Sequence, residues 1–151
     1  MSKVLILYAS MSGNTEAIAD LIGEGLTGKG MNITKLEALD ADSEVLKTYN
    51  RIILGAYTWG DGDLPDEFLD LYDDMREMDL TGKFFAVFGS GDHSYEHFCG
   101  AADTLAECIK QQGGILVLDP LKIEFSPDRD EELLCKDFGW QFSEKALALS
   151  L

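Results

Sequence analysis

The sequence is short of basic residues, and this shortage argues against several classes of protein. It has 12 lysine and arginine residues against 28 aspartate and glutamate residues, a formal net charge of −16 at pH 7. Nucleic acid is an unfavourable partner for such a chain, because binding it depends on cationic groups that displace counterions. Anionic membrane surfaces are disfavoured for the same reason. The negative electrostatic potential around such a chain instead attracts a protein with a basic docking face.

Cysteine and long apolar runs are also scarce. Cys99, Cys108 and Cys135 form an odd, widely spaced set without a CxxC motif. This favours reduced thiols in a cytoplasmic protein and indicates neither zinc nor an iron–sulfur cluster. No apolar run approaches membrane-spanning length, and the first residues lack the pattern of a secretion signal. We therefore expect a cytoplasmic protein, with a single domain over residues 1–151.

The chain begins with an apolar run and a polar turn. Val4 to Ala9 is apolar with almost no alternation, which predicts a strand buried on both faces of a parallel sheet. Apolar residues then recur at helical spacing from Ala17 to Leu26. The turn Ser10–Thr15 therefore lies at a helix N-terminus, where free N–H groups and the helix dipole favour a phosphate. It has no Walker-type lysine, which argues against ATP or GTP hydrolysis. The alternative is an ordinary capped helix.

Strand and helix patterns alternate along the whole chain, without repeats or low-complexity segments. Further strands are predicted over 31–36, 51–56 and 83–88. Residues 115–118 and 121–125 are predicted to form one strand interrupted near Pro120, or a strand and its extension. Helices are predicted over 66–78, 101–112 and 129–149, with a short one possible within 39–49. The apolar side of the last helix is expected to consist of Leu134, Phe138, Phe142, Ala146 and Leu149. This order predicts an α/β fold with a doubly wound, five-stranded parallel sheet and helices on both faces.

Three glycine-rich loops follow strands, at Ser10, Tyr57 and Gly89, so all three are expected at the same edge of the sheet. Two of them carry a large aromatic among small polar residues, Trp59 and Tyr95. A pair of loop aromatics facing one ligand would sandwich a planar ring system. The alternative is that each aromatic packs down over the end of the sheet.

The three loops together resemble those of a known family. Ser10-Met11-Ser12-Gly13-Asn14-Thr15, Thr58-Trp59-Gly60-Asp61-Gly62 and the segment 91–100 are similar to the FMN-binding loops of bacterial flavodoxins. The resemblance covers the chain in order and length. The passage from Gly114 to Pro127 is too short for the insertion that divides the family, so the chain resembles a short-chain flavodoxin.

The resemblance implies non-covalently bound FMN. Its phosphate would lie on the first loop, held by backbone amides and the hydroxyls of Ser10, Ser12 and Thr15. Trp59 would cover the inner face of the ring and Tyr95 the outer face. Backbone groups of Asp92, His97 and Cys99 would meet the pyrimidine edge, and Asp61 the O4 side. The expected cofactor-binding residues are Ser10, Met11, Ser12, Gly13, Asn14, Thr15, Tyr57, Thr58, Trp59, Gly60, Asp61, Ser90, Gly91, Asp92, Tyr95, His97, Phe98 and Cys99. Met11, Tyr57 and His93 depart from the family's usual residues.

We find no arrangement of residues for chemistry on a substrate. His93 and His97 have the spacing of a helical metal pair, but their glycine-rich context predicts a loop without metal. With the flavin supplying the redox chemistry, the protein would bind it, tune it and control access to it. We expect a low-potential, single-electron carrier with a stable neutral semiquinone, favoured by acidic loops and by a flip of the Gly60–Asp61 peptide.

The expected partners are basic-faced redox proteins, such as a flavodoxin/ferredoxin NADP reductase and haem or iron–sulfur acceptor proteins. The strong like charge favours a monomer. An alternative from the enzyme class is an FMN-dependent quinone or azo reductase of the same fold. Such an enzyme needs a nicotinamide site, and we recognise none in the sequence. A receiver-like module is disfavoured, because Ala9-Ser10 stands where receivers carry paired acids.

Overall fold

The apolar run at the start of the chain forms a strand that is covered on both faces. The computed structural model describes residues 3–10, 13–58, 62–92 and 98–149. In it, strand β1 (Lys3–Ala9) is buried from Val4 to Ala9. Alternate side chains of β1 belong to two separate clusters of buried residues, one on each face of the sheet. The near absence of alternation in the sequence follows from this double burial.

The sheet is parallel in every pairing between its described strands. Its order is β2 (Asn32–Glu37), β1, β3 (Arg51–Tyr57) and β4 (Phe84–Gly91), followed by two short strands that share the fifth position. β5 (Ile115–Leu116) pairs with the start of β4, and β6 (Leu121–Glu124) pairs with its end. Proline cannot donate to a ladder, so the break at Pro120 divides the predicted fifth strand in two. The predicted doubly wound α/β fold is confirmed.

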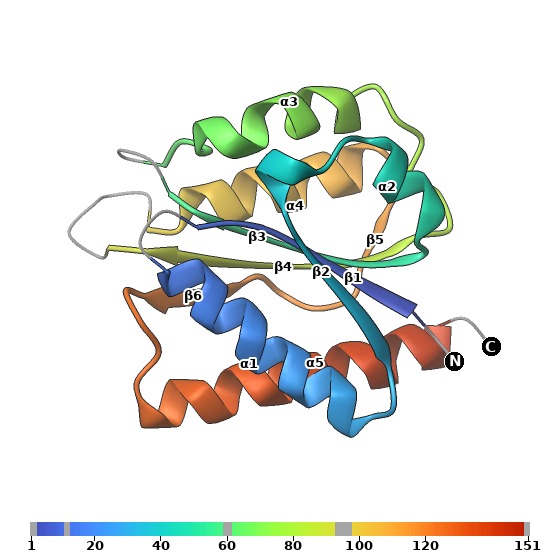
Figure 1. Ribbon diagram of the computed structural model, residues 1–151. Helices are drawn as coiled ribbons and strands as arrows, with labels where there is room; N and C mark the ends of the chain where they lie inside the picture. Colours follow the sequence, from blue (N-terminus) through green and yellow to red (C-terminus); the bar gives the residue numbers. More distant parts are fainter. Residues whose placement is uncertain (1–2, 11–12, 59–61, 93–97, 150–151) are drawn as a thin grey trace.

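Helices cover both faces of the sheet (Figure 1). α1 (Asn14–Gly28) and α5 (Arg129–Leu149) lie on one face, and α3 (Asp66–Met75) and α4 (Gly100–Gln111) lie on the other. The short η1 (Ala38–Asp40) and α2 (Glu44–Thr48) connect β2 to β3, within the segment where a short helix was possible. α3 ends at Met75, earlier than the predicted 78.

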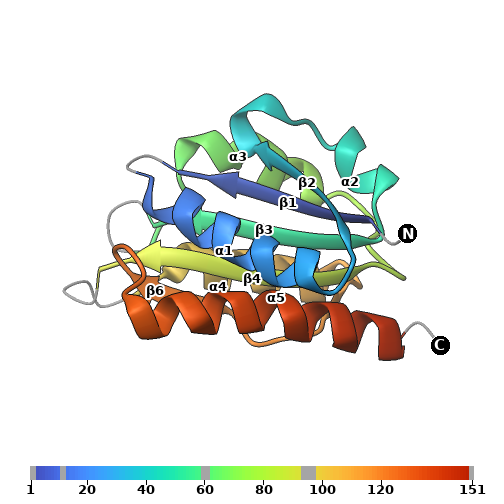
Figure 2. The same cartoon turned by 60° about the horizontal axis from the view of Figure 1, so that its bottom comes forward.

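Helices α1 and α5 lie side by side and approach each other closely (Figure 2). A Cβ atom added at Gly25 would lie 2.0 Å from the carbonyl oxygen of Lys136, and one added at Gly139 would lie 2.3 Å from that of Ile22. Real Cβ atoms do not approach other atoms this closely. Each helix therefore supplies a glycine where the backbone of the other passes.

The predicted inner face of α5 is wrong at two positions. Leu134 and Leu149 are 50% and 57% exposed, whereas Cys135, Phe138 and Phe142 are buried. Successive helical residues are about 100° apart, so burial of Cys135 turns Leu134 towards solvent. Leu149 is in the last turn, where α5 runs on past the end of α1 (Figure 2). None of the helices described in the structure is both long enough and apolar enough to cross a membrane.

Candidate functional site

The carboxyl ends of β1, β3 and β4 meet at one edge of the sheet, as the sequence predicts (Figure 1). Eleven of the predicted cofactor-binding residues are described there or beside it: Ser10, Gly13, Asn14, Thr15, Tyr57, Thr58, Ser90, Gly91, Asp92, Phe98 and Cys99. The predictions for Met11, Ser12, Trp59, Gly60, Asp61, Tyr95 and His97, and the remark on His93, fall outside the described residues. The site is therefore built from the first group.

The turn before α1 is held by one serine side chain. The Ser10 hydroxyl oxygen accepts hydrogen bonds from the backbone N–H groups of Gly13, at 3.1 Å, and Glu16, at 3.3 Å. Gly13 has φ of +89°, a left-handed conformation that glycine adopts without strain. No side chain caps α1 at this residue.

This geometry leaves donors for an anion. The N–H groups of Asn14 and Thr15 are in the first turn of α1, so they have no acceptor within the helix. No hydrogen bond joins either amide to another described residue. An added Cβ atom at Gly13 would have no heavy atom within 4 Å, so the space beside Gly13 is open. Free amides at an open helix N-terminus fit a phosphate group.

The hydroxyl of Thr15 does not lie in the turn alone. Its oxygen is 2.7 Å from that of Ser90 on β4, and both residues are buried. In such a pair one hydroxyl donates to the other, which leaves one hydroxyl hydrogen for a third group. Thr15 and Ser90 can thus offer a ligand one hydroxyl donor between them.

A carboxylate is held beside the same turn. The phenol of Tyr8 donates to Glu16 at 2.8 Å. Burial and this hydrogen bond raise the pKa of Tyr8 above its ordinary value. The described residues of the turn and the first turn of α1 include no lysine or arginine. An anion bound there would have amides and hydroxyls for partners, with a negative charge nearby.

The end of β3 is tied to the two helices on its face. The phenol of Tyr57 donates to Glu67 of α3 at 2.7 Å, and burial together with this bond raises the pKa of Tyr57 to about 12. Thr58 donates its N–H to the carbonyl of Ser90, and its hydroxyl accepts from the N–H of Ala101. The hydroxyl of Tyr57 is therefore engaged with α3.

The start of α4 is packed tightly against the end of β4. Cys99 has φ of 53°, is fully buried, and directs its thiol to the carbonyl of Ile123 at 3.8 Å. Burial raises the pKa of this thiol to about 12. A Cβ atom added at Gly91 would lie 3.0 Å from both the amide nitrogen and the sulfur of Cys99. The Cys99 side chain is thus part of the core.

The connection from β6 to α5 also reaches this edge, which the sequence analysis missed. Phe125 donates its N–H to the carbonyl of Gly91 at 3.0 Å. Ser126 donates its hydroxyl to the side-chain oxygen of Asn14 at 2.7 Å. This short connection therefore links the first and third loops. A polar Ser-Pro turn that directly follows a strand was the signal that could have placed it here.

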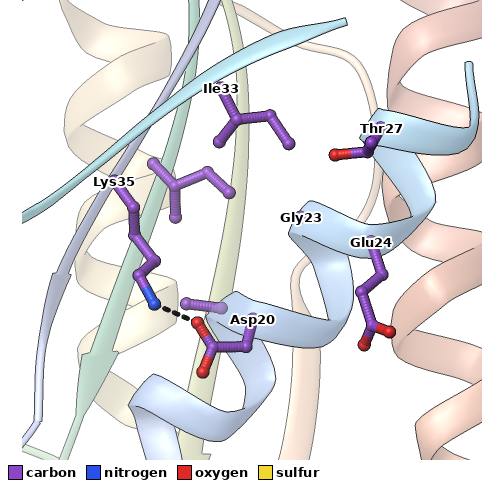
Figure 3. Close-up of a pocket in the computed structure, with 8 residues that line it drawn as sticks. Asp20, Gly23, Glu24, Thr27, Ile33 and Lys35 are labelled. Atoms are coloured by element: carbon purple, nitrogen blue, oxygen red, sulfur yellow. Dashed lines mark hydrogen bonds and ion pairs between the residues drawn. The ribbon is translucent and has the colours of Figure 1, made fainter. Parts of the chain in front are cut away.

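A surface groove lies elsewhere, between α1 and β2 (Figure 3). It has a volume of about 510 Å³, an apolar floor that includes Ile33, and an ion pair between Lys35 and Asp20. Its cation is thus already neutralised. Among the described residues, no group of three or more histidine, cysteine, aspartate or glutamate side chains is arranged to hold a metal ion.

Comparison with known proteins agrees with this geometry. The family model described as Flavodoxin matches residues 6–139. The chain is 55% identical over 147 residues to "Probable flavodoxin 2" of Bacillus subtilis, which covers 97% of each chain. Among solved structures, oxidised Flavodoxin 2 from Bacillus cereus superposes with a TM-score of 0.91 at 48% identity, covering 95% of this chain and 99% of that one. A short-chain flavodoxin associated with a bacterial microcompartment gives 0.92 at 31% identity, covering 97% and 99%.

Proposed function

The chain belongs to the flavodoxin family as a short-chain bacterial member, and we propose that it carries electrons singly, at low potential, between basic-faced redox proteins. Members of the family bind FMN, and the chain is an FMN-binding electron-transfer protein and not an enzyme. The observations that carry the finer proposal are the lysine-free turn before α1 and the acidic surface of α3.

The residues of the first loop fit the phosphate of FMN. We assign the phosphate to the amides of Asn14 and Thr15, with one hydroxyl hydrogen from the Thr15–Ser90 pair. The flavin ring supplies the redox chemistry when bound. We assign its two faces to Trp59 and Tyr95, and its pyrimidine edge to backbone groups of the third loop.

Low potential follows from the charges around such a site. Asp63 and Asp66 are exposed at the beginning of α3, and Glu16 lies in the first turn of α1. A like charge ~10 Å from an added negative charge costs about 0.4–1.7 kcal/mol, for effective dielectrics between about 80 and 20. At roughly 2.3 kcal/mol per 100 mV, each acid lowers the potential of an electron that adds negative charge by about 20–70 mV. A phosphate bound without a cation acts in the same direction.

A one-electron-reduced flavin that stays neutral carries the added proton on a ring nitrogen, so a carbonyl that accepts a hydrogen bond from this N–H would favour transfer of single electrons. We assign this role to the carbonyl of the Gly60–Asp61 peptide, which lies outside the described residues. Glycine at the first central position of a tight turn adopts positive φ at low steric cost, so the peptide can turn its carbonyl towards the ring.

The docking surface that we propose is the acidic ridge, defined as the exposed acids of α3 and its flanks. These residues are Asp63, Asp66, Asp70, Asp73, Asp74, Glu77 and Asp79. The exposed cation within this stretch, Arg76, lies 3.6 Å from the carboxylate of Asp73. A ridge of one sign attracts basic partners and raises their association rate at low salt. A flavodoxin/ferredoxin NADP reductase and haem or iron–sulfur acceptors have the required chemistry.

We further propose that the chain acts in the cytoplasm, as a monomer with a single domain over residues 1–151. Its three cysteines are free and buried, which suits a reducing compartment. The formal net charge of −16 opposes self-association.

Reconstitution tests the proposed function. The FMN-loaded protein is mixed with NADPH, a flavodoxin/ferredoxin NADP reductase and a haem acceptor, and acceptor reduction is followed as salt is raised. We expect electron transfer only with the reductase present, at a rate that falls with salt. Neutralising the ridge with Asp70→Asn and Asp74→Asn should slow transfer at low salt. The control, Glu24→Gln with Asp137→Asn on the opposite face, should not. NADPH oxidation without the reductase would favour a quinone or azo reductase instead.

A further inference from the structure

Phe125 has an unusual backbone conformation. Of the non-glycine residues that the structure describes, Cys99 and Phe125 have positive φ, at 53° and 56°. A bulky side chain in this region is an outlier, because its Cβ atom crowds the following carbonyl group. Such strain costs of the order of 1–3 kcal/mol, and it persists where the surrounding structure imposes it.

The surrounding structure imposes it here through two of the flavin-binding loops. The N–H of Phe125 donates to Gly91 at the end of β4, and the next residue, Ser126, donates to Asn14 at the start of α1. Figure 2 shows the connection between β6 and α5 at the same end of the sheet as the end of β4. Phe125 is thus held at the rim of the proposed flavin site.

The side chain of Phe125 is not used by the core. It is 54% exposed and belongs to neither cluster of buried residues. Trp140, an exposed aromatic on α5, differs in being engaged within the chain. Its ring is covered by Lys29 at 4.4 Å and its N–H donates to Glu144. Within the part of the chain that the structure describes, the ring of Phe125 has no comparable contact.

The chain around Phe125 is acidic. Residues 119–132 contain six acids, Asp119, Glu124, Asp128, Asp130, Glu131 and Glu132, against Lys122 and Arg129. Lys122 is paired with Asp103 of α4 at 2.7 Å. An aromatic group within such a surface is complementary to an apolar depression that basic groups surround. A second copy of this chain or an anionic membrane would be repelled by the same charge.

We propose that Phe125 is the apolar anchor of a second docking surface, formed by the acidic segment 119–132 and distinct from the acidic ridge of α3, and that it enters an apolar depression on a basic-faced electron-transfer partner. The inference rests on the proposed function and deepens it. Aromatic anchors near the centre of an interface carry a large share of binding energy, while charges around them steer the encounter. The exposed side chain of Phe125 lies at the rim of the proposed flavin site, where an electron-transfer partner would approach.

Variants that accept the left-handed backbone test this role. Phe125→Gly and Phe125→Asn both tolerate positive φ and both remove the apolar ring, so the turn should keep its conformation. Phe125→Tyr retains the ring. Leu133→Ala is the matched control, because it removes an apolar side chain that is 64% exposed on α5. Each FMN-loaded variant is titrated into the coupled assay with flavodoxin/ferredoxin NADP reductase.

We expect the KM for the carrier to rise about tenfold in Phe125→Gly and Phe125→Asn, the scale of losing an interface anchor. Phe125→Tyr and Leu133→Ala should stay within about twofold of wild type. The Kd for FMN should stay within about twofold throughout. An unchanged KM in both Phe125→Gly and Phe125→Asn overturns the proposal. A rise in the FMN Kd that parallels KM also overturns it, since the ring would then contact the cofactor. Failure of the proposed function is distinguishable, because wild type itself would then accept no electrons from the reductase.

Discussion

The hydroxyl oxygens of Thr15 and Ser90 lie 2.7 Å apart in the interior, although the two residues are 75 positions apart in the chain. This contact joins the first turn of α1, the helix that follows β1, to the end of β4, and β3 lies between β1 and β4 in the sheet. If Ser90 donates to Thr15, the hydroxyl hydrogen of Thr15 remains for the phosphate. If the order is reversed, Ser90 is the ligand's donor.

If Ser90 donates to Thr15, removing the two hydroxyls one at a time should weaken FMN binding by unequal amounts. Thr15→Val should raise the Kd for FMN about 10- to 100-fold, because it removes a hydrogen bond to a charged group. Ser90→Ala should raise it less than about fivefold, since Thr15 keeps its hydrogen. Both variants should lower the free energy of unfolding of the apoprotein by about 1 kcal/mol. Fluorescence titration of the apoproteins with FMN measures the affinities. A larger effect from Ser90→Ala would reverse the assignment.

The Tyr57–Glu67 hydrogen bond predicts a loss of stability at alkaline pH. The pKa of Tyr57 is raised to about 12 in the folded protein, against about 10 in an unfolded chain. Because the fold favours the neutral phenol, its contribution is fully present below pH about 10 and is lost as pH rises towards 12. The difference in unfolding free energy between wild type and Tyr57→Phe, from urea titrations, should therefore be constant up to pH about 10 and then decrease.

Glu67→Gln separates the causes of that pKa shift. Burial is the largest cause, followed by the hydrogen bond and charge of Glu67. The variant should therefore lower the pKa of Tyr57 while leaving it above the ordinary value. Tyrosinate absorbance, compared with that of Tyr57→Phe, reports this titration. A Tyr57 that ionises in wild type at the ordinary value would contradict the assignment.

Two glycines of α1, two residues apart, should respond to alanine in opposite directions. A Cβ atom at Gly25 would meet the Lys136 carbonyl at 2.0 Å, so Gly25→Ala should destabilise the protein by at least about 1–3 kcal/mol. At Gly23 the nearest atom is a methyl of Ile33 at 3.7 Å, an ordinary contact. Gly23→Ala should therefore stabilise the helix by about 0.5–1 kcal/mol. Urea unfolding of the apoproteins measures both, and equal signs would contradict the packing of α1 on α5.

The flip assigned to the Gly60–Asp61 peptide predicts a loss of one-electron behaviour in Gly60→Ala. The added Cβ atom disfavours positive φ, so the yield of one-electron-reduced flavin at half-reduction should fall. Gly82→Ala is the control, because Gly82 has φ of 84° with no atom near its Cβ position, in the turn that precedes β4. It should cost stability without changing that yield. An unchanged yield in Gly60→Ala would contradict the proposal that a flip of the Gly60–Asp61 peptide favours the one-electron-reduced flavin.

The layers of the fold could be predicted from the sequence because burial leaves a pattern. The continuous apolar run of Val4 to Ala9 is specific to a strand covered on both faces, and the change to helical spacing marks where α1 begins. On α5 the same reasoning predicted Leu134, and not Cys135, on the buried side of the helix. Both residues are apolar, so the hydrophobic pattern does not decide between them, and the structure buries Cys135.

The candidate site was predictable in position but not in its internal contacts. The shared edge of the sheet was predicted from loops at Ser10, Tyr57 and Gly89. In the structure β3 runs on to Tyr57 and β4 to Gly91, so Gly89 lies within β4. The contact of Thr15 with Ser90 depends on strand register, and that of Tyr57 with Glu67 on where α3 begins. Neither contact can be predicted from the residues adjacent to it in the sequence. Phe125 gave no signal of its backbone conformation, because left-handed residues are usually glycine or asparagine.

The most direct test of the account is the visible spectrum of the purified protein during stepwise anaerobic reduction. We predict a yellow, FMN-loaded protein that turns blue near half-reduction, as a neutral one-electron-reduced flavin accumulates, and then bleaches. Bleaching in a single two-electron step would contradict the single-electron function. A colourless protein that takes up no added FMN at micromolar concentrations would contradict the site itself.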